Sequence, residues 1–448
     1  MRTSLSLIIA MLGACALPVD EQAASMPDGK GETGYLSTLA LEYHTTVEGE
    51  IDLPLGAVVE NEISLQVRHA MRQLVRQGLH LNLATDALDS LDRVAVSGTT
   101  ATYRYRFHVE GLITHEELRS KWGLTDPRGL RQRRIGALVP RNVRSLYQTY
   151  GERCAAGYIP GELGEHNYFY YFDPLPGCDV ATTPLAISVE NLAAEANPYP
   201  EYDRLIADRE LSVVAFFGAV EHGEQVRRGD QGMREWRDFI KVLKQLNFQR
   251  IGGDADEPTG KGRIFRRYAN GLTVKLSLFS PRDLQLNRAT GKQLFARMVR
   301  ENELVMYMGH SFYGSLDVLD EPATYDPAMY QIIMVASCWS YEYYTKQVLK
   351  HHPLADVVND TESGWAMNAA EFAEILLTNI VRGSETQGRL DAETVYSWRE
   401  IINRMNVYAQ RAYSAYLHEN PYTNVDHHEI MGVSGVLTNV FQPAPLSD

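Results

Sequence analysis

Four strand-length segments in the carboxy-terminal half of the chain are dominated by apolar residues. They are residues 211–217, 272–279, 304–308 and 332–336. Strands that are buried on both faces have this composition, which is typical of parallel sheets covered by helices on both sides. The intervals between these segments exceed the dozen or so residues that a parallel crossover needs. The sequence therefore predicts a three-layer α/β/α domain with a mostly parallel sheet over residues 205–440.

Helical periodicity is found between and after these segments. One apolar stripe consists of Trp236, Phe239, Ile240, Leu243 and Leu246. A short helix is expected at about 291–300. Asn368 and Glu371 have the spacing of a capping box, which predicts a helix through Val381. A long amphipathic helix at about 391–418 is expected to close the domain.

Residues 34–200 have a different pattern, which predicts an α+β region. Alternating apolar residues begin at Tyr35, and Asn61 is placed to cap a helix that ends at Gly78. Further alternation through residues 94–96 and 103–109 resembles part of a hairpin. Nothing in this region predicts catalysis, so a pro-segment, an inhibitor and a partner-binding module all remain open as its role.

Residues 119–200 are rich in proline, glycine and tyrosine, and they contain a cluster of arginines. The cluster consists of Arg128, Arg131, Arg133, Arg134, Arg141 and Arg144. Docking of anionic lipid headgroups is one interpretation of this cluster. A solvated face whose charges are paired by carboxylates is the interpretation that we favour.

The first 15 residues are predicted to be a targeting segment. Leu5 to Ala14 is almost entirely apolar, but it is too short for a membrane-spanning helix. The run ends in Leu-Gly-Ala-Cys at Cys15 and resembles the lipoprotein box of bacteria, which implies that Cys15 carries a lipid. Residues 16–33 then form a tether. We expect a bacterial cell-envelope protein, with the outer membrane favoured, that contacts the membrane through its lipid.

Net charge limits the class of partner. The chain has 57 acidic and 43 basic residues, and its formal charge is −14. Proteins that bind nucleic acids normally carry the opposite charge, because neutralising phosphates supplies much of their affinity. We therefore expect no nucleic-acid partner. The sequence gives no basis for an oligomeric state.

The four cysteines divide into groups by position. If Cys15 carries a lipid, Cys154 and Cys178 are the candidates for a disulfide, because they bracket a short loop-rich stretch and disulfides persist in exported proteins. Cys338 is then left as a thiol, either inert in the core or chemically useful.

Two apolar segments end in reactive side chains. Residues 304–310 read Leu-Val-Met-Tyr-Met-Gly-His, and residues 332–338 read Ile-Ile-Met-Val-Ala-Ser-Cys. If the two strands pair in parallel, His310 and Cys338 emerge at the same edge of the sheet, where ligands bind in open α/β folds. An imidazolium beside a thiol favours the thiolate, which is the nucleophile.

This arrangement resembles the caspase-like cysteine peptidases, a group that includes caspases, legumains, gingipains, clostripains and separases. Met308-Gly309-His310 and Ala336-Ser337-Cys338 match the two strand ends of the family in order, and the resemblance covers about residues 205–385. It implies a peptide or protein substrate, Cys338 as the nucleophile and His310 as the general acid and base. It also implies an oxyanion site made by the backbone N–H of Cys338 and one near Gly309 or Ser311. Many family members have glycine where this chain has Ser311.

Family specificity pockets are built from loops at strand ends. Asp360 and Glu362 would favour a basic side chain in such a pocket, and His222 and Trp365 are further candidates for lining it.

Other interpretations stay open. Gly309-His310-Ser311 also resembles the nucleophile elbow of α/β-hydrolases, with His427 or His428 as the base and Ser311 as the nucleophile. A caspase-like surface lipoprotein that binds a partner without catalysis is a third possibility. The Asp426-His427-His428-Glu429 run lacks a recognised metal-binding spacing, so we expect neither a metal nor an organic cofactor.

Overall fold

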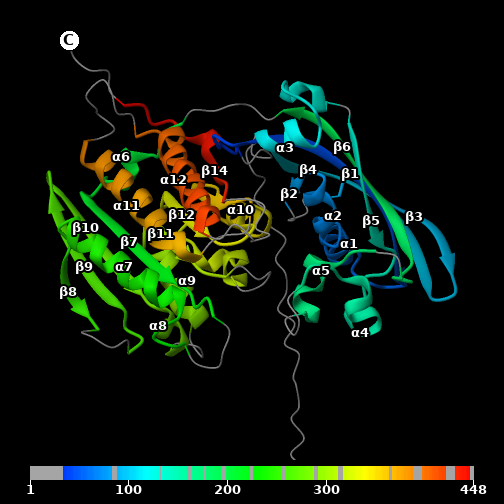
Figure 1. Cartoon of the computed structure of the whole chain (residues 1–448), viewed down its shortest axis with the longest axis horizontal. Coiled ribbons are helices and arrows are strands. Elements are labelled where there is room, and N and C mark those ends of the chain that lie inside the picture. The colour runs from blue at the N-terminus through cyan, green and yellow to red at the C-terminus, as the bar shows by residue number, and fades with distance from the viewer. Residues whose placement is uncertain are drawn as a thin grey trace, which may run out of the picture. The chain divides into compact units, whose positions relative to one another are not determined.

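The computed structural model describes residues 34–82, 88–131, 133–158, 163–174, 177–192, 198–221, 226–254, 259–286, 291–310, 316–362, 366–386, 396–419 and 429–443. These residues form a mixed α/β structure built around two sheets (Figure 1). The signal segment, the tether and Cys15 lie outside the described residues.

The larger sheet contains the four predicted strands. In the described part of the chain its strand order is β14-β13-β12-β11-β7-β10-β9-β8. The strands are β7 (Glu210–Phe217), β8 (Gln249–Gly253), β9 (Arg263–Ala269), β10 (Leu272–Phe279), β11 (Leu304–Met308), β12 (Gln331–Ala336), β13 (Ala355–Asp360) and β14 (Met431–Ser434). The central strands β10, β7, β11, β12 and β13 are parallel. The first four were predicted from the sequence as parts of a mostly parallel sheet, whereas β13 was not predicted as a strand. Strands β14, β9 and β8 add antiparallel edges that the sequence analysis did not predict.

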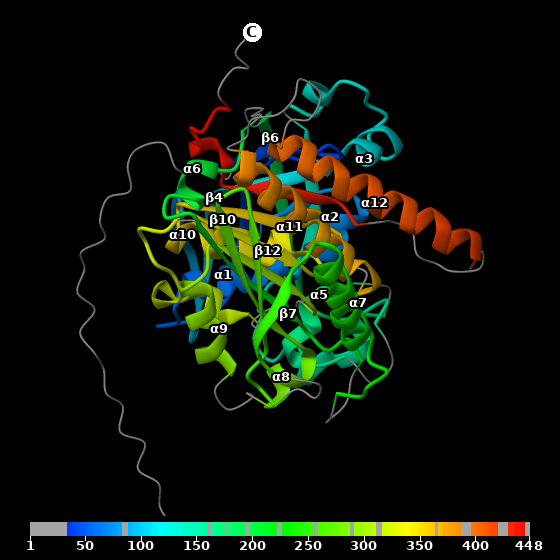
Figure 2. The ribbon, with the colours of Figure 1, turned by 90° about the vertical axis from the view of Figure 1, so that its left-hand side faces the viewer.

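Helices cover both faces of this sheet because its strands are apolar on both sides. The helices are α7 (Gln231–Gln245), α8 (Pro281–Leu286), α9 (Gly291–Arg300), α10 (Ser340–His351), α11 (Ala369–Thr386) and α12 (Trp398–Glu419). Val213 and Ala215 of β7 share a core with α7, α11 and α12, whereas Val214 and Phe216 share a core with α9 and α10. In Figure 2, α7, α11 and α12 lie to the right of the sheet, and α9 and α10 lie to its left.

The smaller sheet lies in the amino-terminal region and is antiparallel throughout its described pairs. Its strands are β1 (Ala40–Pro54), β2 (His80–Leu81), β3 (Ser90–Ser97), β4 (Thr100–Thr114), β5 (Arg134–Pro140) and β6 (Thr182–Leu192). The helices of this part of the chain are α1 (Val59–Arg68), α2 (Met71–Arg76), α3 (His115–Ser120), α4 (Leu146–Tyr150), α5 (Tyr168–Tyr171) and α6 (Tyr202–Leu205). Short 3-10 segments occur at 127–130, 151–154, 165–167, 317–320, 322–324, 366–368 and 436–438.

One predicted helix start and one predicted capping box differ from the structure, although α11 does begin at Ala369, directly after Asn368. The helix expected from Asn61 to Gly78 begins at Val59 and is divided into α1 and α2, because the His69 ring bonds to the Leu65 carbonyl oxygen (2.7 Å) where the first helix ends. At α11 the Asn368 amide donates to Glu429. The Ala370 N–H donates to Glu235 (3.1 Å), whose pKa burial raises to about 7. Tertiary contacts thus occupy the groups that a local capping box would use.

The two sheets belong to one compact unit that begins at Glu32. Leu36 and Val433 exchange backbone hydrogen bonds, and the Tyr341 hydroxyl of α10 donates to Glu42 of β1 (3.0 Å). Lys346 of α10 pairs with Glu110 of β4 (2.8 Å). The amino-terminal region is therefore packed and hydrogen-bonded against α10 and β14.

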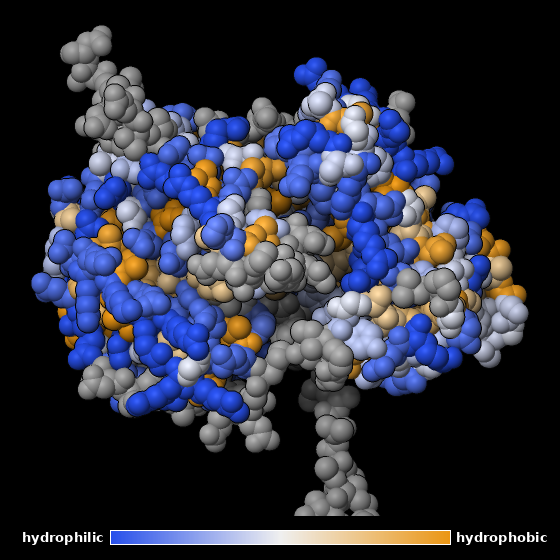
Figure 3. Space-filling model, viewed as in Figure 1, coloured by the Kyte–Doolittle hydropathy of each residue, from blue (hydrophilic) through white to orange (hydrophobic). Residues whose placement is uncertain are grey.

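The expected disulfide is present between Cys154 and Cys178, with 5.0 Å between their Cα atoms. Two arginines of the basic cluster are paired as expected, Arg141 with Asp52 (2.9 Å) and Arg144 with Glu62 (2.6 Å). The face in Figure 3 is mainly hydrophilic, with small hydrophobic patches. Among the residues that the structure describes, no helix combines the length and apolar character needed to cross a membrane.

Candidate functional site

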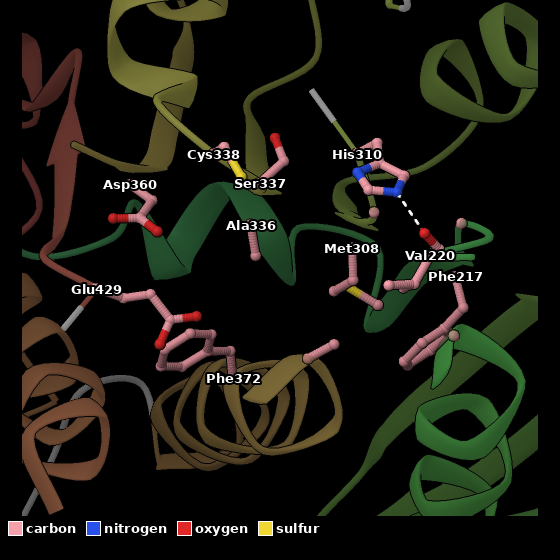
Figure 4. A pocket seen from close by; sticks show the side chains of 14 residues that line it. Phe217, Val220, Met308, His310, Ala336, Ser337, Cys338, Asp360, Phe372 and Glu429 are labelled. Atoms are coloured by element: carbon pink, nitrogen blue, oxygen red, sulfur yellow. Dashed lines mark hydrogen bonds between the residues drawn. The ribbon is translucent and has the colours of Figure 1, made fainter. Parts of the chain in front are cut away.

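His310 and Cys338 follow neighbouring parallel strands at equal offsets. Met308, the last residue of β11, pairs with Ala336, the last residue of β12. His310 and Cys338 each come two residues later, and neighbouring strands lie roughly 4.8 Å apart. Both residues line one pocket at this edge of the large sheet (Figure 4).

The His310 ring is oriented by a backbone carbonyl. Its Nε2 lies 2.7 Å from the carbonyl oxygen of Val220, as the dashed line in Figure 4 shows. A carbonyl oxygen only accepts hydrogen bonds, so Nε2 carries a proton and donates. The tautomer of the neutral ring is thereby set, and Nδ1 becomes the nitrogen that gains and loses a proton. The Tyr307 hydroxyl donates to the His310 carbonyl oxygen (3.0 Å) and holds the main chain.

The loop that carries Val220 is held in turn by Asp230. The N–H groups of Val220 and Glu221 donate to the Asp230 carboxylate at 3.1 and 2.8 Å. Asp230 also caps α7 by accepting from the Met233 N–H (3.3 Å). An aspartate before a helical run is the sequence signal of such a cap, but its second role at the loop has no sequence signal.

Glycines allow the strand ends to approach closely. A Cβ at Gly309 would lie 3.1 Å from the Gly218 Cα and 2.8 Å from the Tyr307 hydroxyl. A Cβ at Gly232, in the first turn of α7, would overlap the Gly218 carbonyl oxygen. The Gly218 N–H donates to the Met308 carbonyl (2.7 Å), which joins the ends of β7 and β11.

Cys338 lies in a tight turn between β12 and α10. Its thiol is half-buried, and the next residue, Trp339, has a left-handed backbone (φ 48°, ψ 37°). A bulky residue in this conformation stores strain that the surroundings must offset. The Trp339 N–H donates to the Glu362 carbonyl (2.8 Å), and its ring packs on Tyr170 of α5 with centroids 5.3 Å apart. The turn places Cys338 at the amino terminus of α10, where the helix dipole favours a thiolate.

One expected oxyanion donor is used elsewhere. The Gly309 N–H is directed at the Ala336 carbonyl oxygen (3.4 Å), within the contact between β11 and β12. The Gly309 N–H thus has an acceptor within the sheet, and an oxyanion donor near Gly309 or Ser311 stays a prediction. Ser311, the alternative donor and the nucleophile of the hydrolase interpretation, lies outside the described residues.

Two carboxylic acids enter the same pocket. Asp360 is the last residue of β13 and is buried, rather than lying in a loop as expected. Its Oδ1 accepts from the N–H groups of Glu362 and Ile430, at 3.0 Å each. Burial, and then the neighbouring Glu429, raise the pKa of Asp360 well above its usual value. Glu429 also lines the pocket, and the sequence analysis considered it only as part of a metal-like run.

Other predicted pocket residues lie elsewhere. The Glu362 side chain points to a buried group around His80 instead of this pocket, because its backbone turns away after β13. His222, Trp365, His427 and His428 are outside the described residues.

The remaining pocket lining is largely apolar. It includes Phe217, Met308, Ala336, Ala369 and Phe372. The cavity volume is about 220 Å³, below the roughly 300–1,000 Å³ of pockets for drug-sized ligands. This size suits one long side chain, with a thiol and an imidazole at the rim and two acids in the wall.

Comparison with known proteins gives no relative for this chain, since no family model, no curated protein and no solved structure matches it.

Proposed function

We propose that this protein is a cysteine endopeptidase of the caspase-like type, with Cys338 as the nucleophile and His310 as the general acid and base. The supporting observation is the in-register parallel pairing of β11 and β12, which brings both side chains to one pocket. The strand order, the helices on both faces and the orientation of the His310 ring agree with this proposal. The strained turn at Trp339 holds the half-buried thiol in the pocket lining, just before the amino terminus of α10.

In the proposed reaction the Cys338 thiolate attacks the scissile carbonyl carbon. The resulting oxyanion accepts from the backbone N–H of Cys338. The C–N bond breaks as His310 Nδ1 gives its proton to the leaving amine, which leaves a thioester on Cys338. Nδ1 then takes a proton from water as the water attacks the thioester. The C–S bond breaks, the acid product leaves, and the Cys338 thiolate and the protonated His310 are restored.

We propose a basic side chain at the position before the cleaved bond. Asp360 and Glu429 supply acidic groups inside a pocket that is otherwise apolar. A lysine or arginine would bury its methylene groups against this lining and pair its charge with the acids. Its arrival would favour ionisation of Asp360, whose pKa is raised in the empty pocket.

The hydrolase interpretation has less support. After β11 the structure describes residues 309–310 and then residues from 316 onward, which form short 3-10 segments. By contrast, β12 is followed after a short turn by the 12-residue helix α10. The strand-turn-helix arrangement that exposes a nucleophile thus occurs at Cys338.

The decisive experiment combines a peptide library with substitutions at the dyad. Cys338→Ala and His310→Ala should each abolish cleavage and labelling by a peptide-based electrophile while circular dichroism is unchanged. Ser414→Ala, at an exposed residue of α12 that does not line the pocket, is the control and should remain active. Full cleavage by Cys338→Ala would exclude the mechanism. If Ser311→Ala lost cleavage while Cys338→Ala kept it, a serine hydrolase would be favoured.

We also propose that Cys15 carries a lipid that anchors the protein in a bacterial envelope. The Cys154–Cys178 disulfide agrees with an oxidising compartment. Metabolic labelling with a palmitate analogue should be lost in Cys15→Ala and retained in Cys338→Ala.

A further inference from the structure

A buried group of ionisable side chains lies apart from the pocket. His80 comes from β2, Glu117 from α3 and Glu362 from the segment after β13. The distances from His80 Nε2 are 3.6 Å to Glu117 Oε2 and 3.4 Å to Glu362 Oε1. The ligand atoms of the three residues all lie within 4.8 Å of one another. We call these three residues the His80 cluster.

A fourth residue orients the histidine of this cluster. His80 Nδ1 lies 3.2 Å from Glu342 Oε1 of α10, and both side chains are buried. A carboxylate on one ring nitrogen holds the proton there and turns the lone pair of the other nitrogen toward a ligand. The Nε2 atom makes no hydrogen bond within the described part of the chain, although it is fully buried and faces both cluster carboxylates.

The spacing of the ligand atoms matches a metal better than direct hydrogen bonds. An N–H···O bond is normally about 2.7–3.2 Å long. Nitrogen and oxygen ligands at about 2.0–2.2 Å from a tetrahedral ion are separated by roughly 3.3–3.6 Å. The two distances from His80 Nε2 agree with the second geometry.

The charges of this group can be balanced by a bound cation or by a proton on His80: burial lowers the pKa of His80, but Glu362, Glu117 and Glu342 together raise it well above its usual value. Three carboxylates, those of Glu117, Glu342 and Glu362, face one imidazole. The Lys121 ammonium contacts the outer oxygen of Glu117 (3.3 Å). Burying several carboxylates is costly unless cations neutralise them. The Thr114 hydroxyl and N–H hold Glu117 Oε2, at 3.1 and 3.3 Å, as outer contacts often do for a metal-binding carboxylate.

We propose that His80, Glu117 and Glu362 bind one divalent cation of the zinc class, with Glu342 positioning His80. One imidazole and two carboxylates form a three-ligand set that zinc accepts with water in the fourth position. The ion joins the amino-terminal sheet to the end of β13. Because the Glu362 carbonyl accepts from the Trp339 N–H, the ion also supports the turn at Cys338. The site does not depend on the proposed peptidase activity.

The test uses the chain carrying Cys338→Ala, so that the thiol does not supply a ligand. The protein is stripped of metal by dialysis against a chelator and then titrated with Zn²⁺ by calorimetry and with Co²⁺ by visible absorption. We expect one ion per chain, the spectrum of a tetrahedral Co²⁺ site and a higher Tm with Zn²⁺.

Conservative variants identify the ligands. Glu362→Gln and Glu117→Gln should each weaken Zn²⁺ binding at least 100-fold and remove the rise in Tm. Glu110→Gln is the matched control, because Glu110 is a buried carboxylate that pairs with Lys346 across the same two parts of the chain but lies outside the cluster. This variant should bind one Zn²⁺ with unchanged affinity.

Several results would overturn the proposal. One is a folded protein that binds no Zn²⁺ or Co²⁺, and another is unchanged binding by both glutamine variants. Persistence of a protonated His80, seen by NMR in excess Zn²⁺, would mean that an imidazolium rather than a metal neutralises the carboxylates. Glu117 lies on a short surface helix, so Glu117→Gln keeps the test decisive if Glu362→Gln fails to fold.

Discussion

His310 and Val220 are 90 positions apart in the chain, yet the ring Nε2 of one donates to the carbonyl oxygen of the other over 2.7 Å. This contact sets which nitrogen of the imidazole exchanges a proton. It exists because the loop after β7 is held against the end of β11, through Asp230 on one side and close glycine contacts on the other. The proposed chemistry therefore depends on residues outside the proposed dyad.

Asp230→Ala should lower peptide cleavage and the rate of electrophile labelling at Cys338 by tenfold or more. The loop loses the carboxylate that holds the N–H groups of Val220 and Glu221, and a small displacement of a reacting group is costly in rate. Loss of the α7 cap should lower stability by about 1 kcal/mol. Asp230→Asn keeps one acceptor oxygen and should recover much of the rate. Equal rates in Asp230→Ala and the unmodified protein would show that the loop does not orient His310.

Gly232→Ala should destabilise the protein by about 1–3 kcal/mol and reduce cleavage, because the added methyl group overlaps the Gly218 carbonyl oxygen. Helix propensity alone predicts the opposite sign, since alanine normally stabilises a helical position relative to glycine. Gly229→Ala is the control, because the nearest atom to a Cβ there is 4.0 Å away on a flexible arginine. Urea unfolding of the two variants measures the difference, and similar curves for both would contradict the prediction.

Acid should destabilise the fold through His69. Burial lowers the pKa of His69 from 6.5 to about 4, and its ring contacts Phe172 at 5.3 Å between centroids. The unfolded chain takes up a proton near pH 6.5 while the folded chain does not, so stability is full above pH 6.5 and falls as the pH decreases toward 4. The loss is roughly 3 kcal/mol at 1.36 kcal/mol per pKa unit. His69→Gln lacks this titrating group. The difference in free energy of unfolding between the parent protein and the variant should therefore shrink as the pH falls from 7.5 to 4.5. A constant difference between the two proteins across this range would exclude the effect.

Removing the disulfide should lower the free energy of unfolding by about 3 kcal/mol, because a closed loop of this size restricts the unfolded chain. The Cys154→Ser, Cys178→Ser double variant tests this by denaturant unfolding. Reductant should then have no further effect on the variant. The assignment would be contradicted if the double variant were as stable as the oxidised parent protein while reductant still destabilised the parent protein.

Much of the larger sheet could be predicted from the sequence because its central strands are apolar on both faces. Strands β7, β10, β11 and β12 have this pattern, and their lengths agree with the structure. The edge strands β8 and β9 carry charged and exposed residues, so the same signal is weak there. Strand β13 ends in Asp360, a buried acid that the sequence analysis assigned to a loop.

The sequence by itself determined the strand-forming segments, the candidate disulfide and the positions of His310 and Cys338 at strand ends, because each depends on local composition or on spacing along the chain. Only the tertiary structure decided which carbonyl orients His310, which acids share the pocket and where Glu362 points. The His80 cluster, drawn from residues 80, 117 and 362, has no recognisable spacing at all. Such sites depend on how distant segments pack against one another, and the free energy of that packing depends on several segments together, so no local pattern predicts it.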